Sequence, residues 1–123
     1  MQGSSGNEGL SAERCPLRVV TTVVSVPTAD RLIIDGGMKT FRLFPSMPYG
    51  LILEDPTIKF SGMSVEHGHV DTSDSNRRYI VGDKLTIIPT YQEGVTNLHD
   101  EIVWARNDQV DRVWRNDGRG KVK

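Results

Sequence analysis

Five side chains that could bind a metal ion or move a proton follow closely after a predicted strand. The apolar run of residues 84–88 is expected to form this strand, and Pro89 ends it because proline has no N–H to donate. Polar residues at the end of a rigid strand are well placed for binding or catalysis, but connecting loops are also polar. The residue types alone therefore leave a functional site and a plain loop both open. The side chains in question are Tyr91, Glu93, Asn97, His99 and Asp100.

Two further histidines, His67 and His69, have the spacing of residues on one face of a strand, which metal sites use. Two imidazoles are too few ligands for a site, so Glu66 or Asp71 would have to complete the set. Gly68 between the histidines indicates a turn, which would point the two rings apart. A metal site here is one hypothesis, and an ordinary strand–turn–strand unit is the alternative.

No complete catalytic motif accompanies these residues. His99 and Asp100 have the types of an acid–base pair, but neighbouring residues of a strand point to opposite faces. The sequence contains no Gly-rich phosphate loop and no nucleophile elbow. Cys15 is the single cysteine, which excludes a disulfide framework and fits a reducing compartment. We interpret it as a small buried apolar residue.

The composition is that of one small globular domain. The chain has 123 residues, of which 25% are charged and 37% hydrophobic. Its formal net charge of -1 gives no electrostatic reason for nucleic acid or an anionic membrane to be the main partner. The first residues lack the apolar core of a signal peptide, and no stretch approaches transmembrane length, so we expect a cytoplasmic protein.

Short runs rich in β-branched residues recur along the chain, and no window longer than about two turns keeps a helical period. The run at 17–26 is almost continuously apolar, so we expect a long central strand covered on both faces, followed by a turn at 27–30. This pattern predicts an all-β fold, either a small Greek-key-like barrel or a sandwich, with irregular segments at the N-terminus and around 38–57. Further strands are expected at 31–35, 49–54, 84–88, 101–106 and 109–115, with two short ones in 59–72 around a turn at His67-Gly68.

Paired glycines, Gly36 and Gly37, interrupt the pattern after the second strand. Such a pair indicates either positive φ angles or a close approach of two backbones. The prolines that follow limit any helix there to a short one. We interpret the apolar residues of this segment as a satellite core formed by Phe41, Leu43, Phe44 and Tyr49.

The last predicted hairpin carries both tryptophans of the chain. Asn107-Asp108 is its predicted turn. Trp104 and Trp114 are expected to be core residues or cross-strand aromatic partners.

Five stretches, in matching order and spacing, carry a resemblance to a known family. They are CPLRVVTTVVSVPTADRLIIDGGMKT (15–40), SVEHGHV (64–70), VGDKLTIIP (81–89), VTNLHDEI (95–102) and VWRNDGRGK (113–121). Together they resemble the C-terminal domain of the D-threonine aldolase / D-serine dehydratase-like enzymes, fold-type III pyridoxal-phosphate proteins related to alanine racemase. The resemblance implies one β domain over 15–123. Residues 1–14 are expected to be irregular because they are rich in glycine and serine.

The resemblance also implies roles for particular residues. In that family a His-x-Asp or His-x-Cys pair after the strand-ending proline binds a divalent metal, and the aligned positions here are Tyr91 and Glu93. Glu93 keeps an oxygen ligand, whereas the neutral phenol of Tyr91, with a pKa of about 10, is a poor one. The alternatives for Tyr91 are a proton-donating or orienting hydroxyl in a metal-free site, with His99 as the second catalytic candidate, and an aromatic residue that caps the strand.

The family's cofactor lysine and phosphate loops lie on an N-terminal (β/α)₈ barrel that has no counterpart in this sequence. Lys39 belongs to the β domain's own IDGGMKT motif, so we expect a structural role for it or a contact with a neighbouring domain. Pyridoxal phosphate provides the electron sink that chemistry at Cα requires. We therefore expect the chain to be a fragment or one half of a split enzyme. It would complete a site for D-3-hydroxy amino acids together with a barrel domain or subunit, and it would be inactive alone.

Two other hypotheses belong to different functional classes. One is a stand-alone interaction or structural barrel, such as a homodimer that uses the surface facing the barrel in the family. The other is a small metalloprotein built on Glu66, His67 and His69.

Overall fold

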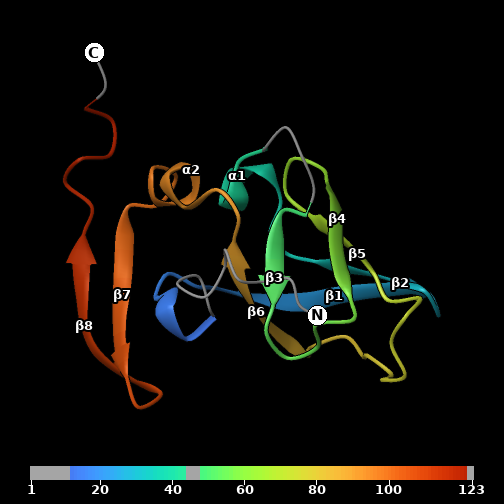
Figure 1. Cartoon of the computed structure of the whole chain (residues 1–123). Coiled ribbons are helices and arrows are strands. Elements are labelled where there is room, and N and C mark those ends of the chain that lie inside the picture. The colour runs from blue at the N-terminus through green and yellow to red at the C-terminus, as the bar shows by residue number, and fades with distance from the viewer. Residues whose placement is uncertain (1–11, 44–47, 122–123) are drawn as a thin grey trace, which may run out of the picture.

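Six antiparallel strands form one sheet that curls into a nearly closed barrel (Figure 1). The strands are β1 (Val19–Thr28), β2 (Arg31–Ile34), β3 (Gly50–Ile52), β4 (Lys59–Met63), β5 (Gly68–Asp71) and β6 (Lys84–Pro89). Their order in the sheet is β3-β6-β1-β2-β5-β4. The edge strands almost meet, because the Tyr49 N–H donates to the Phe60 carbonyl of β4 across 3.3 Å.

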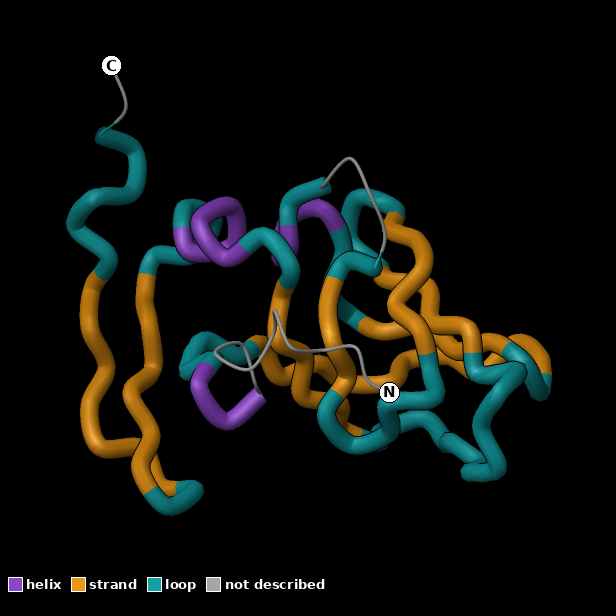
Figure 2. Tube along the Cα trace, in the orientation of Figure 1, coloured by secondary structure: helices purple, strands orange, loops and turns teal. Residues whose placement is uncertain are grey.

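The computed structural model describes residues 12–43 and 48–121. Most of the predicted irregular segment 1–14 lies outside these residues, as does Phe44. Within them the all-β prediction is confirmed, with a barrel-like sheet rather than a sandwich. The helices are short: a 3₁₀ helix (Ala12–Arg14), α1 (Met38–Phe41) and α2 (Gln92–Thr96) (Figure 2). No helix in this part of the chain has the length and apolarity needed to span a membrane.

One apolar core fills the barrel, and the predicted satellite core is wrong in two places. Phe41 is 2% exposed and packs edge-on against Phe60 in the main core, with ring centroids 4.9 Å apart. Leu43 is exposed, while Tyr49 lies at the core margin. The side chains of the main core are Val23, Leu32, Ile34, Phe41, Ile52, Ile58, Phe60, Val70, Tyr79, Leu85, Ile87 and Val95.

The central strand β1 is covered on one face only. Thr21 and Val23 point into the core, whereas Val20 is 67% and Val24 40% exposed. The expectation of two covered faces is therefore wrong, because the sheet is antiparallel and its outer face can stay in water. Cys15 is half-buried rather than buried.

Two predicted turns lie elsewhere. β1 continues through Thr28, so the first turn is Ala29-Asp30. Gly68 is the first residue of β5, and the turn before it covers residues 64–67. A Cβ at Gly68 would meet the Gly36 carbonyl and the Ile34 side chain within 2.7 Å, so this glycine permits a close approach rather than a turn.

The predicted C-terminal hairpin is confirmed and stands beside the barrel (Figure 1). It consists of β7 (Glu101–Arg106) and β8 (Gln109–Arg115). Asn107 and Asp108 have φ angles of 53° and 62°, as a two-residue hairpin turn of type I′ requires. The rings of Trp104 and Trp114 are cross-strand neighbours with centroids 5.2 Å apart, but they are 40% and 46% exposed and are not core residues.

The carboxylate of Asp55 joins the loop after β3 to the loop before β6. The hydroxyls of Ser75 and Tyr79 each donate to Asp55 Oδ2 across 2.6 Å, and the Thr57 hydroxyl and N–H donate to Oδ1 across 2.5 and 3.0 Å. These hydrogen bonds hold the pKa of Asp55 far below its usual range, and the bond from Ser75 has the largest effect. Burial, and then the hydrogen bond to Asp55, raise the pKa of Tyr79 to about 12.

Asp55→Asn should lower the free energy of unfolding by about 2 kcal/mol near pH 7, because the amide loses the charge that strengthens these hydrogen bonds. Since the pKa of Asp55 is lower in the folded protein than in the unfolded chain, its contribution is present above about pH 4 and fades as the pH falls below that value. Urea unfolding between about pH 7 and pH 2 should therefore show the gap between the two proteins narrowing.

Asp74→Asn is the matched control, since Asp74 makes only an exposed ion pair with Lys59 at 3.4 Å. A gap that is equally wide at both ends of the pH range would contradict the role given to Asp55.

Candidate functional site

One end of the barrel is built from α1, α2 and the turn at 64–67. The N–H groups of Met38 and Lys39 donate to the carbonyls of Ser64 and Val65, each across 3.0 Å, so this turn satisfies the first donors of α1. A Cβ on Gly37 would collide with the backbone of the same turn. The paired glycines thus serve a close approach and not a positive φ, since the φ of Gly37 is −124°.

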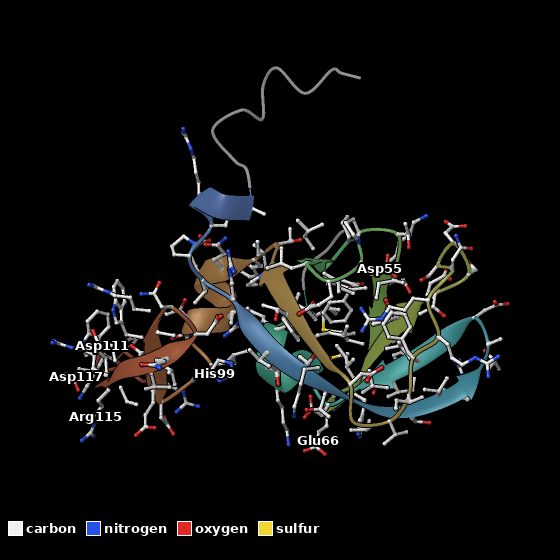
Figure 3. All side chains as sticks on the ribbon, turned by 90° about the horizontal axis from the view of Figure 1, so that it is seen from below. Asp55, Glu66, His99, Asp111, Arg115 and Asp117 are labelled. Carbon is white, nitrogen blue, oxygen red and sulfur yellow. The ribbon has the colours of Figure 1, made fainter. Side chains whose placement is uncertain are left out.

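A shallow depression of about 330 Å³ opens at this end. The Nζ of Lys39 lies 2.9 Å from Glu66 Oε1, and this hydrogen bond lowers the pKa of Glu66. Both side chains are about two-thirds exposed, so the pair contributes little to stability. Figure 3 shows Glu66 at the open surface. The depression is lined by Asp35, Lys39, Thr40, Glu66 and His67.

His99 fastens α1 to the base of the hairpin. Its Nε2 lies 3.0 Å from the Thr40 carbonyl, so the ring donates when that nitrogen carries the proton. The side-chain amide of Asn116 donates to the carbonyls of His99 and Thr96 across 3.1 and 2.7 Å. Half-buried His99 therefore lies beside the depression, between the barrel and the hairpin (Figure 3).

Tyr91 and Glu93 lie at the start of α2, where the sequence predicted either a site or a plain loop. The alternative of a plain loop is wrong for residues 92–96, because they form the helix α2, with Tyr91 as its N-cap. The Tyr91 ring lies over Gly94, where an added Cβ would come within 2.7 Å of it. Glu93 is exposed in the first turn of the helix.

Arg42 ends α1 in a strained conformation. Its φ and ψ are 60° and 138°, outside the regions that L-residues favour, and such strain costs about 1–3 kcal/mol. Its Cδ would lie 2.9 Å from a Cβ on Gly94, so the Arg42 and Tyr91 side chains meet over this glycine. Within the described residues no carboxylate pairs with the guanidinium of Arg42. No local pattern in the sequence singles out Arg42, because its conformation depends on how α1 ends against α2.

The side chains of the metalloprotein hypothesis do not converge. His69 points away from the barrel core and its ring lies over Gly62, while His67 belongs to the turn before β5. Between residues 12 and 121, apart from the gap at 44–47, no three His, Cys, Asp or Glu side chains are grouped as metal ligands. His67 instead lines the depression with Glu66, and Asp71 caps the N–H of Ser73 across 2.8 Å.

Comparisons with known proteins point to one family. A family model described as "Putative serine dehydratase domain" matches residues 16–105. The chain is 30% identical to a D-threonine aldolase of Arthrobacter sp over 118 residues, which cover 96% of this chain and 31% of that protein. It is 31% identical to a 3-hydroxy-D-aspartate aldolase of Paracoccus denitrificans (strain Pd 1222) over 105 residues, which cover 85% of this chain and 26% of that protein.

A solved structure shares the fold. The crystal structure of D-threonine aldolase from Filomicrobium marinum superposes with a TM-score of 0.76 and 25% identity, over 86% of this chain and 29% of that one. The chain therefore spans less than a third of the length of each of these three relatives.

Arg42→Gly should raise the free energy of unfolding by about 1 kcal/mol, because glycine adopts this conformation without strain and keeps the N–H that donates to the Met38 carbonyl. Urea unfolding measures the change. Asn107→Gly is the control, since asparagine tolerates its left-handed turn position and should respond less. A loss of stability in Arg42→Gly would show that the strain has been misjudged.

Proposed function

This chain belongs to the serine dehydratase domain family, and we propose that residues 15–123 act as the β domain of a pyridoxal-phosphate-dependent lyase for D-3-hydroxy amino acids. The proposal rests on how the two sequences match: almost the whole of this chain matches less than a third of the length of an aldolase relative. A polypeptide bearing a barrel domain would supply the remainder of the active site.

The described residues do not fit pyridoxal phosphate by themselves. The depression at the α1–α2 end is open, and the amine of Lys39 within it is occupied by its ion pair with Glu66. An enclosed pocket and a free lysine amine would both be needed. We therefore assign the coenzyme, which supplies the electron sink, to the barrel-bearing polypeptide.

This chain's own part is to form one wall of the site. Tyr91 is the candidate for the hydroxyl that donates a proton or orients the substrate, and Arg42 beside it adds a cation that suits a substrate carboxylate. His99 is the second catalytic candidate. Its contact with the Thr40 carbonyl holds the segment after α2 against α1. His67 and Glu66 line the neighbouring depression.

The family's divalent metal does not fit the residues present. The pair aligned with the family ligands is Tyr91 and Glu93, and no third donor is grouped with them in the described chain. A neutral phenol and one exposed carboxylate make a weak donor set. We therefore propose a metal-independent use of this wall.

Mixing the chain with the remaining portion of the Arthrobacter D-threonine aldolase and pyridoxal phosphate should produce cleavage of D-threonine that neither part shows alone. Tyr91→Phe should lower kcat in this mixture by about 10²-fold, because a positioned proton donor contributes at least that much. Glycine released over time measures the reaction.

Tyr49→Phe is the matched control, since Tyr49 sits at the margin of the core and should leave kcat unchanged. An inactive mixture in which the two parts nevertheless bind each other would count against the lyase function.

Tyr91→His should create weak metal binding that the natural chain lacks, because an imidazole would then stand two residues before Glu93 and water could fill the remaining coordination positions. Mn²⁺ or Zn²⁺ at about ten times its Kd should raise the Tm of this variant by about 5 °C and leave the natural chain unchanged. Tyr91→Phe serves as the control without a ligand. An equal metal-induced shift in the natural chain would show that Tyr91 and Glu93 already bind the ion.

A further inference from the structure

The β7–β8 hairpin carries large apolar side chains on both of its faces. The register pairs Ile102 with Trp114, so Trp104 lies on that same face, two residues along. It also pairs Val103 with Val113 on the opposite face. The register shifts between Trp104 and Ala105, and Ala105 then pairs with Val110 on the same face as the valines. A strand pair that had one face in water would alternate apolar and polar residues, and this one does not.

These side chains are open to solvent in the isolated chain. The faces differ in kind, since one carries the two tryptophans and the other a row of valines. The exposed fractions are 40% for Trp104, 46% for Trp114, 57% for Val103, 66% for Val110 and 50% for Val113. Within the described residues the hairpin is a separate sheet of two strands, so each strand also keeps one unpaired edge. A hairpin of this kind is marginal in water unless something packs against it.

The hairpin is nevertheless held firmly at its base. Asn116 follows β8, and its N–H donates to the Asp100 carbonyl across 2.7 Å while its side chain binds the carbonyls of Thr96 and His99. Arg119 Nη1 lies 2.8 Å from Asp100 Oδ1. The arm therefore projects from the barrel in a defined direction, as Figures 1 and 3 show.

We propose that this hairpin is the docking arm for the barrel-bearing polypeptide and inserts between two apolar layers of it. This inference rests on the proposed function. The match to the Arthrobacter enzyme leaves at most five residues of this chain unmatched, so most of the hairpin lies in the shared part. More than two-thirds of that enzyme lies outside the match and is available to cover the arm.

The two apolar faces distinguish this occupant from a second copy of the chain. A single two-fold contact between copies joins one self-complementary patch and would cover one face of each hairpin. A longer polypeptide can cover both. Arg112 is the cross-strand partner of Trp104 and lies on the same face of the hairpin. The part of the partner polypeptide that covers this face is therefore expected to carry an acidic group at its rim.

The two tryptophans provide a direct test, because both tryptophans of the chain lie on this arm. The full chain labelled with 5-fluorotryptophan should give two ¹⁹F resonances. Both should shift when the unlabelled remainder of the Arthrobacter D-threonine aldolase is added, and neither should depend on the concentration of the chain alone. Val113→Lys should weaken the binding by about tenfold or more, as expected for a buried apolar contact in an interface.

Ile80→Lys is the matched control, because Ile80 is 63% exposed on the loop between β5 and β6, and it should bind normally. Val113→Thr keeps a branched Cβ for the strand and should weaken binding less than lysine does, which guards against a simple loss of the hairpin. Unchanged ¹⁹F resonances of the free variants confirm that the arm is folded.

The outcomes separate this inference from the proposed function. Activity in the mixture that Val113→Lys leaves unaffected would overturn the docking arm and leave the lyase proposal standing. Hairpin-dependent binding without any activity would support the arm and reject the lyase. Resonances that move only with the concentration of the chain itself would identify a second copy as the occupant and overturn the inference, as would the absence of binding.

Discussion

The close approach of Gly37 to the turn at 64–67 is the constraint on which the candidate site depends. Any side chain at this position would strike the backbone of that turn. Because the two backbones touch, the first N–H groups of α1 can bind the turn's carbonyls, and Phe41 enters the core three residues after the helix begins. The same docking sets Lys39 beside Glu66 and brings the Thr40 carbonyl to His99. The absence of a side chain at Gly37 therefore determines how α1 packs at this end of the barrel.

Local signals in the sequence were sufficient for the strands. Runs of valine, isoleucine and threonine predicted an all-β fold, and Asn107-Asp108 predicted the last turn, because these preferences arise from the residues themselves. They did not distinguish a barrel from a sandwich. The outer face of β1 was misjudged, since an apolar run does not reveal which of its faces another element covers. The helix α2 was missed because a five-residue helix that contains Gly94 is stabilised by its surroundings rather than by its propensity.

The site was predictable only in part. The order of polar residues after Pro89 and the family resemblance singled out Tyr91, Glu93 and His99. The partner of His99 lies 59 residues away in the sequence, and no local pattern indicates such a distant contact. The strain at Arg42 likewise follows from how α1 ends against α2, which only the folded chain reveals. Lys39 lies in an exposed ion pair with Glu66, and its expected role, structural or in contact with a neighbouring domain, stays a prediction.

Hydrogen bonds of His99 and Asn116 connect α1, α2 and the β7–β8 hairpin. The hairpin and the residues proposed to line the active site are therefore held in position relative to each other. An arm docked on a second polypeptide would therefore set the position of Tyr91 and Arg42 against whatever that polypeptide holds. Such an arrangement places recognition and chemistry on different parts of a larger enzyme, with this domain providing orientation.

In the function proposed above, this chain forms only one wall of an active site. The most direct test is to incubate the purified chain with pyridoxal phosphate, reduce it with borohydride, and determine by mass spectrometry whether any lysine has retained the coenzyme. We expect no more attachment than in the denatured chain, and no turnover of D-3-hydroxy amino acids before reduction. Stoichiometric attachment at Lys39 of the folded chain, accompanied by turnover, would contradict it.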